Sequence, residues 1–258
     1  MPFVPPSALT PVQVEAVRFA TQHRIQFAIY VEATLSAPPD DGANRRILFG
    51  RQGVALTIDF AKVTVRTLIG ALSAPELAVA VAVDRRAELH IEAGQIEAVR
   101  ALLAGRITGV KTLRLYEMTG PGIGLADPRC RRLRADDLPL VAEFYERFYP
   151  STVFSAWMLE NPFYGLFEGG SLLAAGGVVA ASERLAAANL GNFLTHPGHR
   201  GRRLAGAVTA SLTRALHEGG VRRFALATNV ENRSAWRCYE RAGFGLAEER
   251  PQVDLRAP

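Results

Sequence analysis

The first half of the chain changes between helical and strand-like spacing of its apolar residues. Thr10 followed by Pro11 is a typical helix start, because the hydroxyl caps the first turn and proline fits the first helical position. Apolar residues at helical spacing then predict one helix to about His23. Residues 25–35 fit either a helix or a strand, and the composition of residues 36–44 predicts a loop.

Short β-rich segments bounded by glycine, proline or aspartate follow this loop. Residues 47–60, 62–70 and 77–84 are predicted to form strands of one sheet. Residues 95–103 have helical spacing, and residues 110–118 alternate as a further strand. The first half is therefore expected to be an α/β or α+β domain.

Glycine and proline interrupt the chain between residues 119 and 128, where the sequence reads TGPGIGLADP. This composition is typical of a linker, and no long helix follows directly, as a dinucleotide-binding glycine motif would require. We therefore expect an N-terminal α/β domain over residues 1–120, a linker over 121–129 and a second domain over 130–258.

The second half is predicted to be α/β as well. Asp136 and Asp137 place negative charge at the positive end of a predicted helix, and Gly219 ends another. The predicted strands are residues 130–133, 164–167, 172–180, 186–195, 221–228 and 251–255, and the predicted helices are residues 135–148, 154–160, a run through 216, and 233–241.

An arginine- and glycine-rich turn joins the strand that ends at Thr195 to the helix that follows. The turn includes Arg200, Arg202, Arg203 and Gly206. A helix start presents unpaired backbone N–H groups and the positive end of the helix dipole, which together suit a phosphate or pyrophosphate. The turn alone is equally compatible with a surface connection whose arginines face water.

Composition excludes several classes of protein. The net charge of +5 is spread along the chain without clustered aromatics, which argues against nucleic-acid binding. No apolar run is long enough to span a membrane, and the first residues lack the features of a signal peptide. Cys130 and Cys238 form neither a metal set nor a disulfide framework, so we expect a cytoplasmic protein with no metal.

Two motifs in the second half resemble the GNAT superfamily of acetyl-CoA-dependent N-acyltransferases. The first is HPGHRGRRLA, where Arg200 and Ala205 match the ends of the family pattern of Arg or Gln, two residues, Gly, one residue, then Gly or Ala. Arg203 replaces the central glycine of that pattern. The second is NRSAWRCYERAGF, residues 232–244, which is similar to the family's Asn, Ala, Tyr and Gly-Phe signature.

The resemblance implies a mixed, twisted sheet flanked by helices, with acetyl-CoA bound beside the strand that ends at Thr195. Family members hold the pyrophosphate of the cofactor on backbone N–H groups of the following turn, and they place the acetyl and pantetheine end along the strand. The cofactor-binding residues implied here are Leu194, Thr195, Arg200, Gly201, Arg202, Arg203, Leu204, Ala205, Gly206 and Asn232.

Tyr239 occupies the family position of the proton donor to the departing thiolate, although it could also be a packing aromatic. Asn232 could cap a helix as well as contact the cofactor, and Cys238 is expected to pack in the core. The general base is not assigned, because the strand that often supplies a carboxylate has only asparagines here. The candidates for the base are His196, His199, Glu143, Glu146 and Glu168.

The resemblance implies an N-acetyltransferase that moves an acetyl group from acetyl-CoA to a primary amine of a small molecule or peptide by direct attack in a ternary complex. The alternative is a coenzyme A binding or sensing module without catalysis. The N-terminal half is either a degenerate second copy of the fold, as in tandem members, or an unrelated α/β lid. No nucleic-acid or membrane partner is expected, and a homodimer is one of the oligomeric states left open.

Overall fold

The computed structural model describes residues 10–21, 24–36, 45–60, 62–124 and 126–258, and these residues form two compact units. Unit 1 comprises Met1–Arg114 and Glu248–Pro258, and unit 2 comprises Leu115–Ala247. The chain passes from unit 1 to unit 2 within strand β5 (Ile107–Thr119) and returns within strand β11 (Gly245–Leu255). The division thus differs from the expected boundaries, because the last residues pair with a strand of the first half.

Unit 1 contains a mixed sheet with the strand order β1-β2-β3-β4-β11-β5. Strands β1, β2 and β3 are antiparallel, whereas β3 and β4 are parallel, and β11 pairs with β4 in the antiparallel sense. The elements up to β5 are α1 (Pro11–Thr21), α2 (Ile25–Ser36), β1 (Arg45–Phe49), β2 (Gln52–Asp59), β3 (Thr64–Ala71), α3 (Ala74–Val81), β4 (Ala87–His90) and α4 (Ile96–Leu103).

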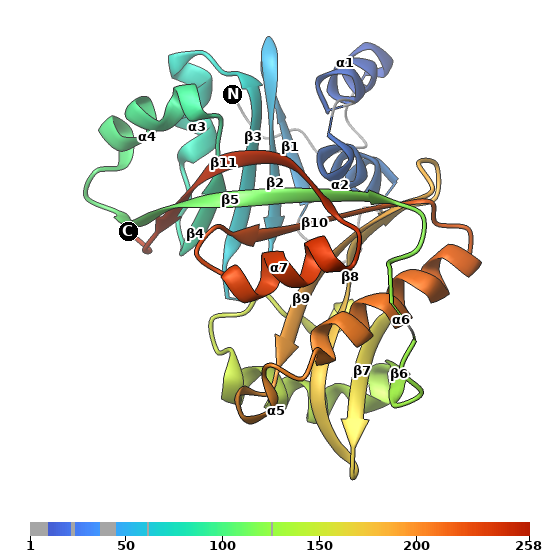
Figure 1. The fold of residues 1–258 in the computed structure, drawn as a ribbon. Coiled ribbons are helices and arrows are strands. Elements are labelled where there is room, and N and C mark those ends of the chain that lie inside the picture. The colour runs from blue at the N-terminus through green and yellow to red at the C-terminus, as the bar shows by residue number, and fades with distance from the viewer. Residues whose placement is uncertain (1–9, 22–23, 37–44, 61, 125) are drawn as a thin grey trace. The chain divides into compact units, whose positions relative to one another are not determined.

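Helices α3 and α4 cover one side of this sheet, and α1 and α2 lie on the other side of β1 to β3 (Figure 1). The core under α3 and α4 draws on both helices and on strands from each end of the chain, as shown by the buried side chains of Leu77, Val99, Leu68 and Val253. The ambiguous residues 25–35 are helical, and residues 37–44 of the expected loop lie outside the described residues.

The prediction of a strand over residues 77–84 is wrong, because this segment forms most of helix α3. Its alanines and valines are apolar on every side, so their spacing does not distinguish a buried strand from a buried helix. The start signal was present in the sequence. Ser73 is the N-cap, a proline occupies the first turn, and the Glu76 carboxylate accepts a hydrogen bond from the Ser73 N–H at 2.8 Å. The strand that follows, β4, was not predicted.

Unit 2 contains a sheet with the strand order β5-β10-β9-β8-β7-β6, in which β9 and β10 are parallel and β6 to β9 are antiparallel. Helix α6 lies in front of β7 and β8 in Figure 1, and α5 lies behind them. The elements are β6 (Cys130–Leu133), α5 (Leu138–Phe148), β7 (Phe163–Glu168), β8 (Ser171–Ser182), β9 (Ala187–Thr195), α6 (Leu204–Glu218), β10 (Arg223–Asn229) and α7 (Arg233–Arg241).

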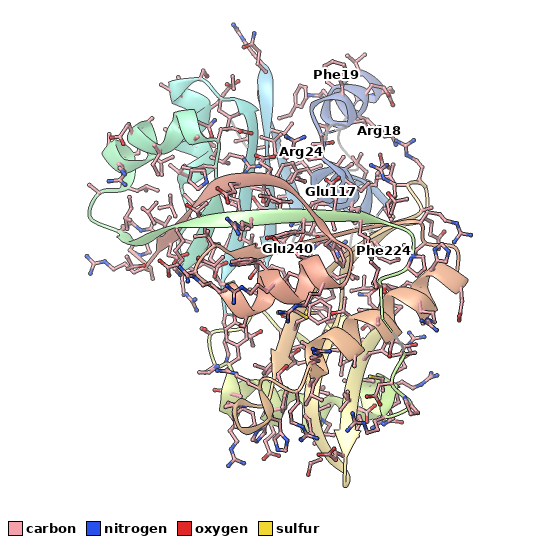
Figure 2. All side chains as sticks on the ribbon, viewed as in Figure 1. Arg18, Phe19, Arg24, Glu117, Phe224 and Glu240 are labelled. Atoms are coloured by element: carbon pink, nitrogen blue, oxygen red, sulfur yellow. The ribbon has the colours of Figure 1, made fainter. Side chains whose placement is uncertain are left out.

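The core of unit 2 lies beneath α6 and α7. Phe224 of β10, labelled in Figure 2, is fully buried there with Leu212 of α6 and Phe244 after α7. The short helix expected over residues 154–160 is a 3-10 turn at Ala156–Leu159, and the last strand starts at Gly245 rather than near Pro251. The order of elements in this unit otherwise follows the sequence-based prediction.

Candidate functional site

The turn before α6 is built from a short 3-10 segment and two residues in the left-handed backbone region. His196 caps the segment Pro197–His199 by accepting a hydrogen bond on Nδ1 from the Gly198 N–H at 3.1 Å. Gly201 has a φ of 79°, and Arg203, the N-cap of α6, has a φ of 61°. Arg203 stands where the family pattern has its central glycine. The backbone at this position is therefore left-handed although a residue with a side chain adopts that conformation only at a cost in free energy.

The backbone N–H groups of residues 201–206 are available to a ligand. None of them donates to another group in the described part of the chain, and the first amide of α6 to find a partner is that of Ala207, which donates to the Arg203 carbonyl at 3.1 Å. The Leu204 side chain is buried under the helix, whereas Ala205 and Gly206 are half-buried. This run of amides at the positive end of α6 suits a phosphate or pyrophosphate group.

The three arginines of the turn have different surroundings. Arg200 and Arg203 are exposed, and neither guanidinium forms a hydrogen bond or an ion pair with another described residue. Arg202 instead forms an ion pair with Glu168 at 2.9 Å, and its Nη1 lies 2.7 Å from Nδ1 of His199. Arg200 and Arg203 are therefore the cations of this turn that remain open to an anionic ligand.

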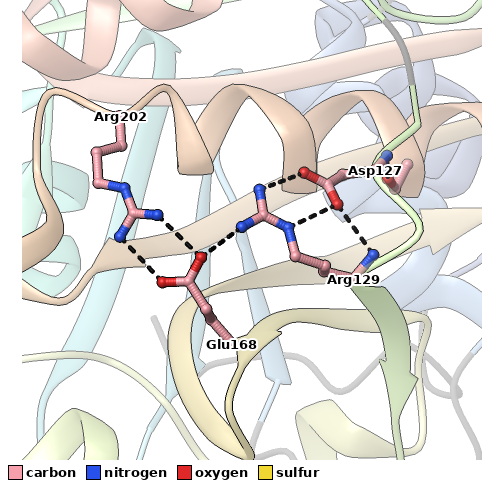
Figure 3. A network of polar contacts seen from close by, with 5 residues as sticks. Asp127, Arg129, Glu168 and Arg202 are labelled. Atoms are coloured by element: carbon pink, nitrogen blue, oxygen red, sulfur yellow. Dashed lines mark hydrogen bonds and ion pairs between the residues drawn. The ribbon is translucent and has the colours of Figure 1, made fainter.

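Glu168 belongs to a network that extends away from the turn (Figure 3). Its carboxylate also accepts from Arg129 at 2.8 Å, and Arg129 is paired with Asp127 at 2.8 Å. The Arg202 guanidinium hydrogen-bonded to Glu168 lowers the pKa of that carboxyl below its ordinary value. A carboxylate with a lowered pKa is a weaker base, so the network argues against Glu168 as the general base.

Strands β9 and β10 separate beside the turn. Their parallel pairing ends at Leu190 and Leu226, although β9 continues to Thr195 and β10 to Asn229. On its other side β9 stays paired with β8, with Leu194 opposite Ala175. The edge of β9 beyond Leu190 can therefore offer backbone groups to an extended ligand in the way that an added strand would.

Asn192 distorts β9 at the middle of this edge. Its backbone lies in the left-handed region with a φ of 55°, and the Tyr145 hydroxyl donates to its carbonyl oxygen. The Asn192 side chain is held by Thr152 at 3.3 Å and by the Met158 sulfur at 2.9 Å. Asn192 was not among the predicted site residues, because no local sequence signal indicates its contacts with residues that lie 34 or more positions earlier.

Tyr239 lies on α7 and faces the separated strands. Its side chain is 6% exposed, and its ring contacts those of Phe193 on β9 and Tyr116 on β5, with centroid distances of 5.8 and 6.3 Å. Within the described residues, no protein group hydrogen-bonds to its Oη. Burial raises the pKa of Tyr239 above its ordinary value of 10.0, so the phenol keeps its proton and is able to donate it in a hydrogen bond.

Two other residues of the second motif, Asn232 and Cys238, have capping and packing contacts. Asn232 is the N-cap of α7, and its Oδ1 accepts from the Ala235 N–H at 3.3 Å and from Ser234 at 3.0 Å. Burial raises the pKa of the Cys238 thiol, which argues against a nucleophile and agrees with the packing role expected from the sequence. A Cβ added to Gly206 would lie 3.7 Å from the Cys238 sulfur, so α6 and α7 approach closely here.

The remaining base candidates lie in two places, Glu143 and Glu146 on α5 and the two histidines in the turn before α6. Glu143 and Glu146 are exposed on α5. His196 packs its ring on Phe148, with 4.4 Å between centroids, and lies 5.0 Å from the ring of His199. Because Nδ1 of His196 accepts a hydrogen bond, only its Nε2 carries the proton in the neutral ring.

The described residues contain no group of three or more histidine, cysteine or acidic side chains placed to hold a metal ion. Neither do their helices include one that is both long enough and apolar enough to cross a membrane.

The comparisons with known proteins identify the class of this site. Residues 128–244 match the sequence model of the Acetyltransferase (GNAT) family, and this part of the chain is therefore a GNAT acetyltransferase domain. The match contains both motifs on which the resemblance rested, and the recognition of the family is confirmed. No curated protein matches the sequence with significance.

Solved structures extend the likeness to the whole chain. A Drosophila protein from a structural genomics project aligns with a TM-score of 0.72 at 15% identity, covering 98% of both chains. A putative GNAT-family acetyltransferase from Novosphingobium aromaticivorans aligns with a TM-score of 0.61 at 18% identity, covering 97% of this chain and 100% of that one. A tandem GNAT protein from the clavulanic acid biosynthesis pathway aligns with a TM-score of 0.61 at 13% identity, covering 99% and 98%.

These alignments show that the GNAT-like fold runs through the entire chain. Of the two alternatives left open for the N-terminal half, a degenerate copy of the fold is the one that agrees with these alignments.

Proposed function

We propose that unit 2 transfers the acetyl group of acetyl-CoA to a primary amine of a small molecule or peptide, within a ternary complex. The observation that carries the proposal is the run of open backbone N–H groups at residues 201–206, flanked by the open guanidinium groups of Arg200 and Arg203. This arrangement supports the binding of a pyrophosphate with its negative charges on the amides and the arginines.

The separated edge of β9 is the part of the site that would hold the pantetheine arm. Its backbone groups beyond Leu190 would pair with the amides of the arm, and Leu194 and Thr195 would lie beside its acetyl end. Asn192 keeps this edge in a bent conformation through Tyr145, Thr152 and Met158, so its geometry is formed before a ligand binds.

Tyr239 would supply the proton that the departing sulfur takes up. When the amine nitrogen forms a bond to the acetyl carbon, the carbon–sulfur bond breaks, the sulfur takes the electron pair, and the nitrogen releases a proton to solvent, from which the Tyr239 phenolate would be reprotonated. The raised pKa keeps the proton on the Oη of Tyr239, which has no hydrogen-bond partner among the described residues, and the Oη can donate to that sulfur. The apolar surroundings disfavour a free thiolate as well as a phenolate, so the hydroxyl would stabilise the departing sulfur through a hydrogen bond along which the proton moves. The amine must reach the site unprotonated.

The test is acetyl-CoA-dependent thiol release measured across a panel of primary amines, with the acetylated product identified by mass spectrometry. We expect thiol release that requires an amine and initial rates that depend on both substrates in a sequential pattern. Calorimetric binding of acetyl-CoA with no thiol release for any amine would instead support a coenzyme A sensing module. A parallel-line pattern would contradict the ternary complex.

A further inference from the structure

Unit 1 repeats the chain order that forms the proposed coenzyme A site in unit 2. Strand β3, helix α3, strand β4 and helix α4 follow one another as β9, α6, β10 and α7 do. Each parallel pair also has the same short register, from Thr64 opposite Ala87 to Thr67 opposite His90 in unit 1. Beyond its last paired residue β3 continues to Ala71, so unit 1 has a strand edge equivalent to the edge of β9.

We propose that unit 1 has closed its own copy of the site with side chains of this chain, so that each chain binds one acetyl-CoA, in unit 2. The inference rests on the proposed function of unit 2 for the site that stays open. Three local features of unit 1 support it: the edge of β3, the residue that fills the gap beside this edge, and the start of α3.

The backbone groups on the edge of β3 are already paired with side chains. The Leu68 carbonyl accepts from Arg250 at 2.7 Å. The Gly70 N–H donates to the Glu92 carboxylate at 3.2 Å, and the Gly70 carbonyl accepts from the Gln95 amide at 3.1 Å. Leu68 and Gly70 are two residues apart, so their backbone groups face the same neighbour, which is the side of β4. A pantetheine arm would have to displace all three side chains.

Arg250 fills the gap between the ends of β3 and β4. The residue is 2% exposed, and its Nε donates to the carbonyl of Ile91, just after β4, at 3.3 Å. Its guanidinium also lies 3.3 Å from the Glu92 carboxylate and 4.7 Å from the centre of the Phe27 ring. Displacing a charged group with these partners has a high free-energy cost, because the carbonyls and the carboxylate would lose their hydrogen-bond donor inside the protein.

The start of α3 is occupied by a carboxylate. Glu76 accepts hydrogen bonds from the N–H and hydroxyl of Ser73 at 2.8 and 2.7 Å and from the Arg51 N–H at 2.9 Å. These bonds, the one from the Ser73 backbone first, lower the pKa of Glu76 and keep it ionised. Pro75 in the first turn has no N–H to donate. A pyrophosphate would therefore meet a fixed negative charge at the start of α3. The start of α6, in contrast, offers it unpaired backbone amides.

Calorimetric titration of the full chain with acetyl-CoA tests the proposal through the number of sites. We expect one site per chain, and we expect the double variant Arg200→Ala, Arg203→Ala to weaken that site at least tenfold. The variant Glu76→Gln, which removes the charge at the start of α3, should leave the stoichiometry and the affinity of the site in unit 2 unchanged within twofold.

The outcomes separate the two proposals. Two sites in the wild-type chain would overturn the closure of unit 1 while leaving the function of unit 2 standing. One site that persists in the arginine variant but responds to Glu76→Gln would overturn both, because it would place the ligand in unit 1. If acetyl-CoA does not bind at all, both the proposed function of unit 2 and the expected stoichiometry of one site per chain are overturned. Circular dichroism is the control that each variant is folded.

Discussion

Replacing Tyr239 with phenylalanine removes one hydroxyl from the proposed site and little else. The ring keeps its contacts with Phe193 and Tyr116, since neither contact involves the Oη. No described group loses a hydrogen-bond partner, so we expect the free energy of unfolding to change by less than about 1 kcal/mol. Any change in activity of this variant can therefore be assigned to the loss of the Oη proton.

The expected effect on turnover follows from the role of that proton. General acid catalysis contributes about 10²- to 10⁴-fold, so Tyr239→Phe should lower kcat by more than about tenfold, which equals about 1.4 kcal/mol in the barrier. The affinity for acetyl-CoA should stay within about twofold, because the hydroxyl acts after binding. Thiol release at saturating substrates measures kcat, and calorimetry with acetyl-CoA alone measures the affinity.

Tyr116→Phe is the matched control. It removes the hydroxyl of the neighbouring tyrosine, which donates to Glu240 at 3.2 Å, and should reduce stability slightly while leaving kcat within about twofold. An unchanged kcat in Tyr239→Phe would refute Tyr239 as the acid. An equal decrease in both variants would refute it as well, because the loss would then come from packing.

Three further predictions follow from the structure. Arg200→Ala should raise the Kd for acetyl-CoA by about five- to tenfold, as for the loss of one charge-assisted contact, whereas Arg214→Ala at the far end of α6 should not; equal affinities would exclude Arg200 from the site. Arg203→Gly should raise the free energy of unfolding in urea by up to about 1 kcal/mol, because it relieves a φ of 61°; a decrease would show that the arginine side chain holds the turn. Burial lowers the pKa of His90 from 6.5 to about 4, with Arg250 and Asp254 as its charged neighbours, so the stability it contributes is present above pH 6.5 and declines as the pH falls. The wild type should therefore lose about 3 kcal/mol more than His90→Gln between pH 7 and pH 4, and equal losses would contradict the lowered pKa.

The sequence determined those features that depend on neighbouring residues. The start of α6 after an arginine-rich turn and the Asn232 cap of α7 are local patterns, and both appear where they were predicted. The two motifs were sufficient for the family because their residue types and spacing act within single turns. The ends of β8, β9 and β10 were predicted to within about two residues, whereas β11 begins at Gly245, well before the start predicted near Pro251.

The tertiary structure decided which of these residues are open to a ligand. Arg202 and Arg203 are adjacent in the sequence, yet only the tertiary contact with Glu168, 34 positions earlier, commits Arg202 to an ion pair. The apolar segment of α3 became a helix because its packing and cap outweighed an uninformative alternation. Arg250 closes a gap beside Leu68, which lies 182 positions earlier. Such contacts depend on the path of the chain through both sheets, and a linear pattern carries no information about that path.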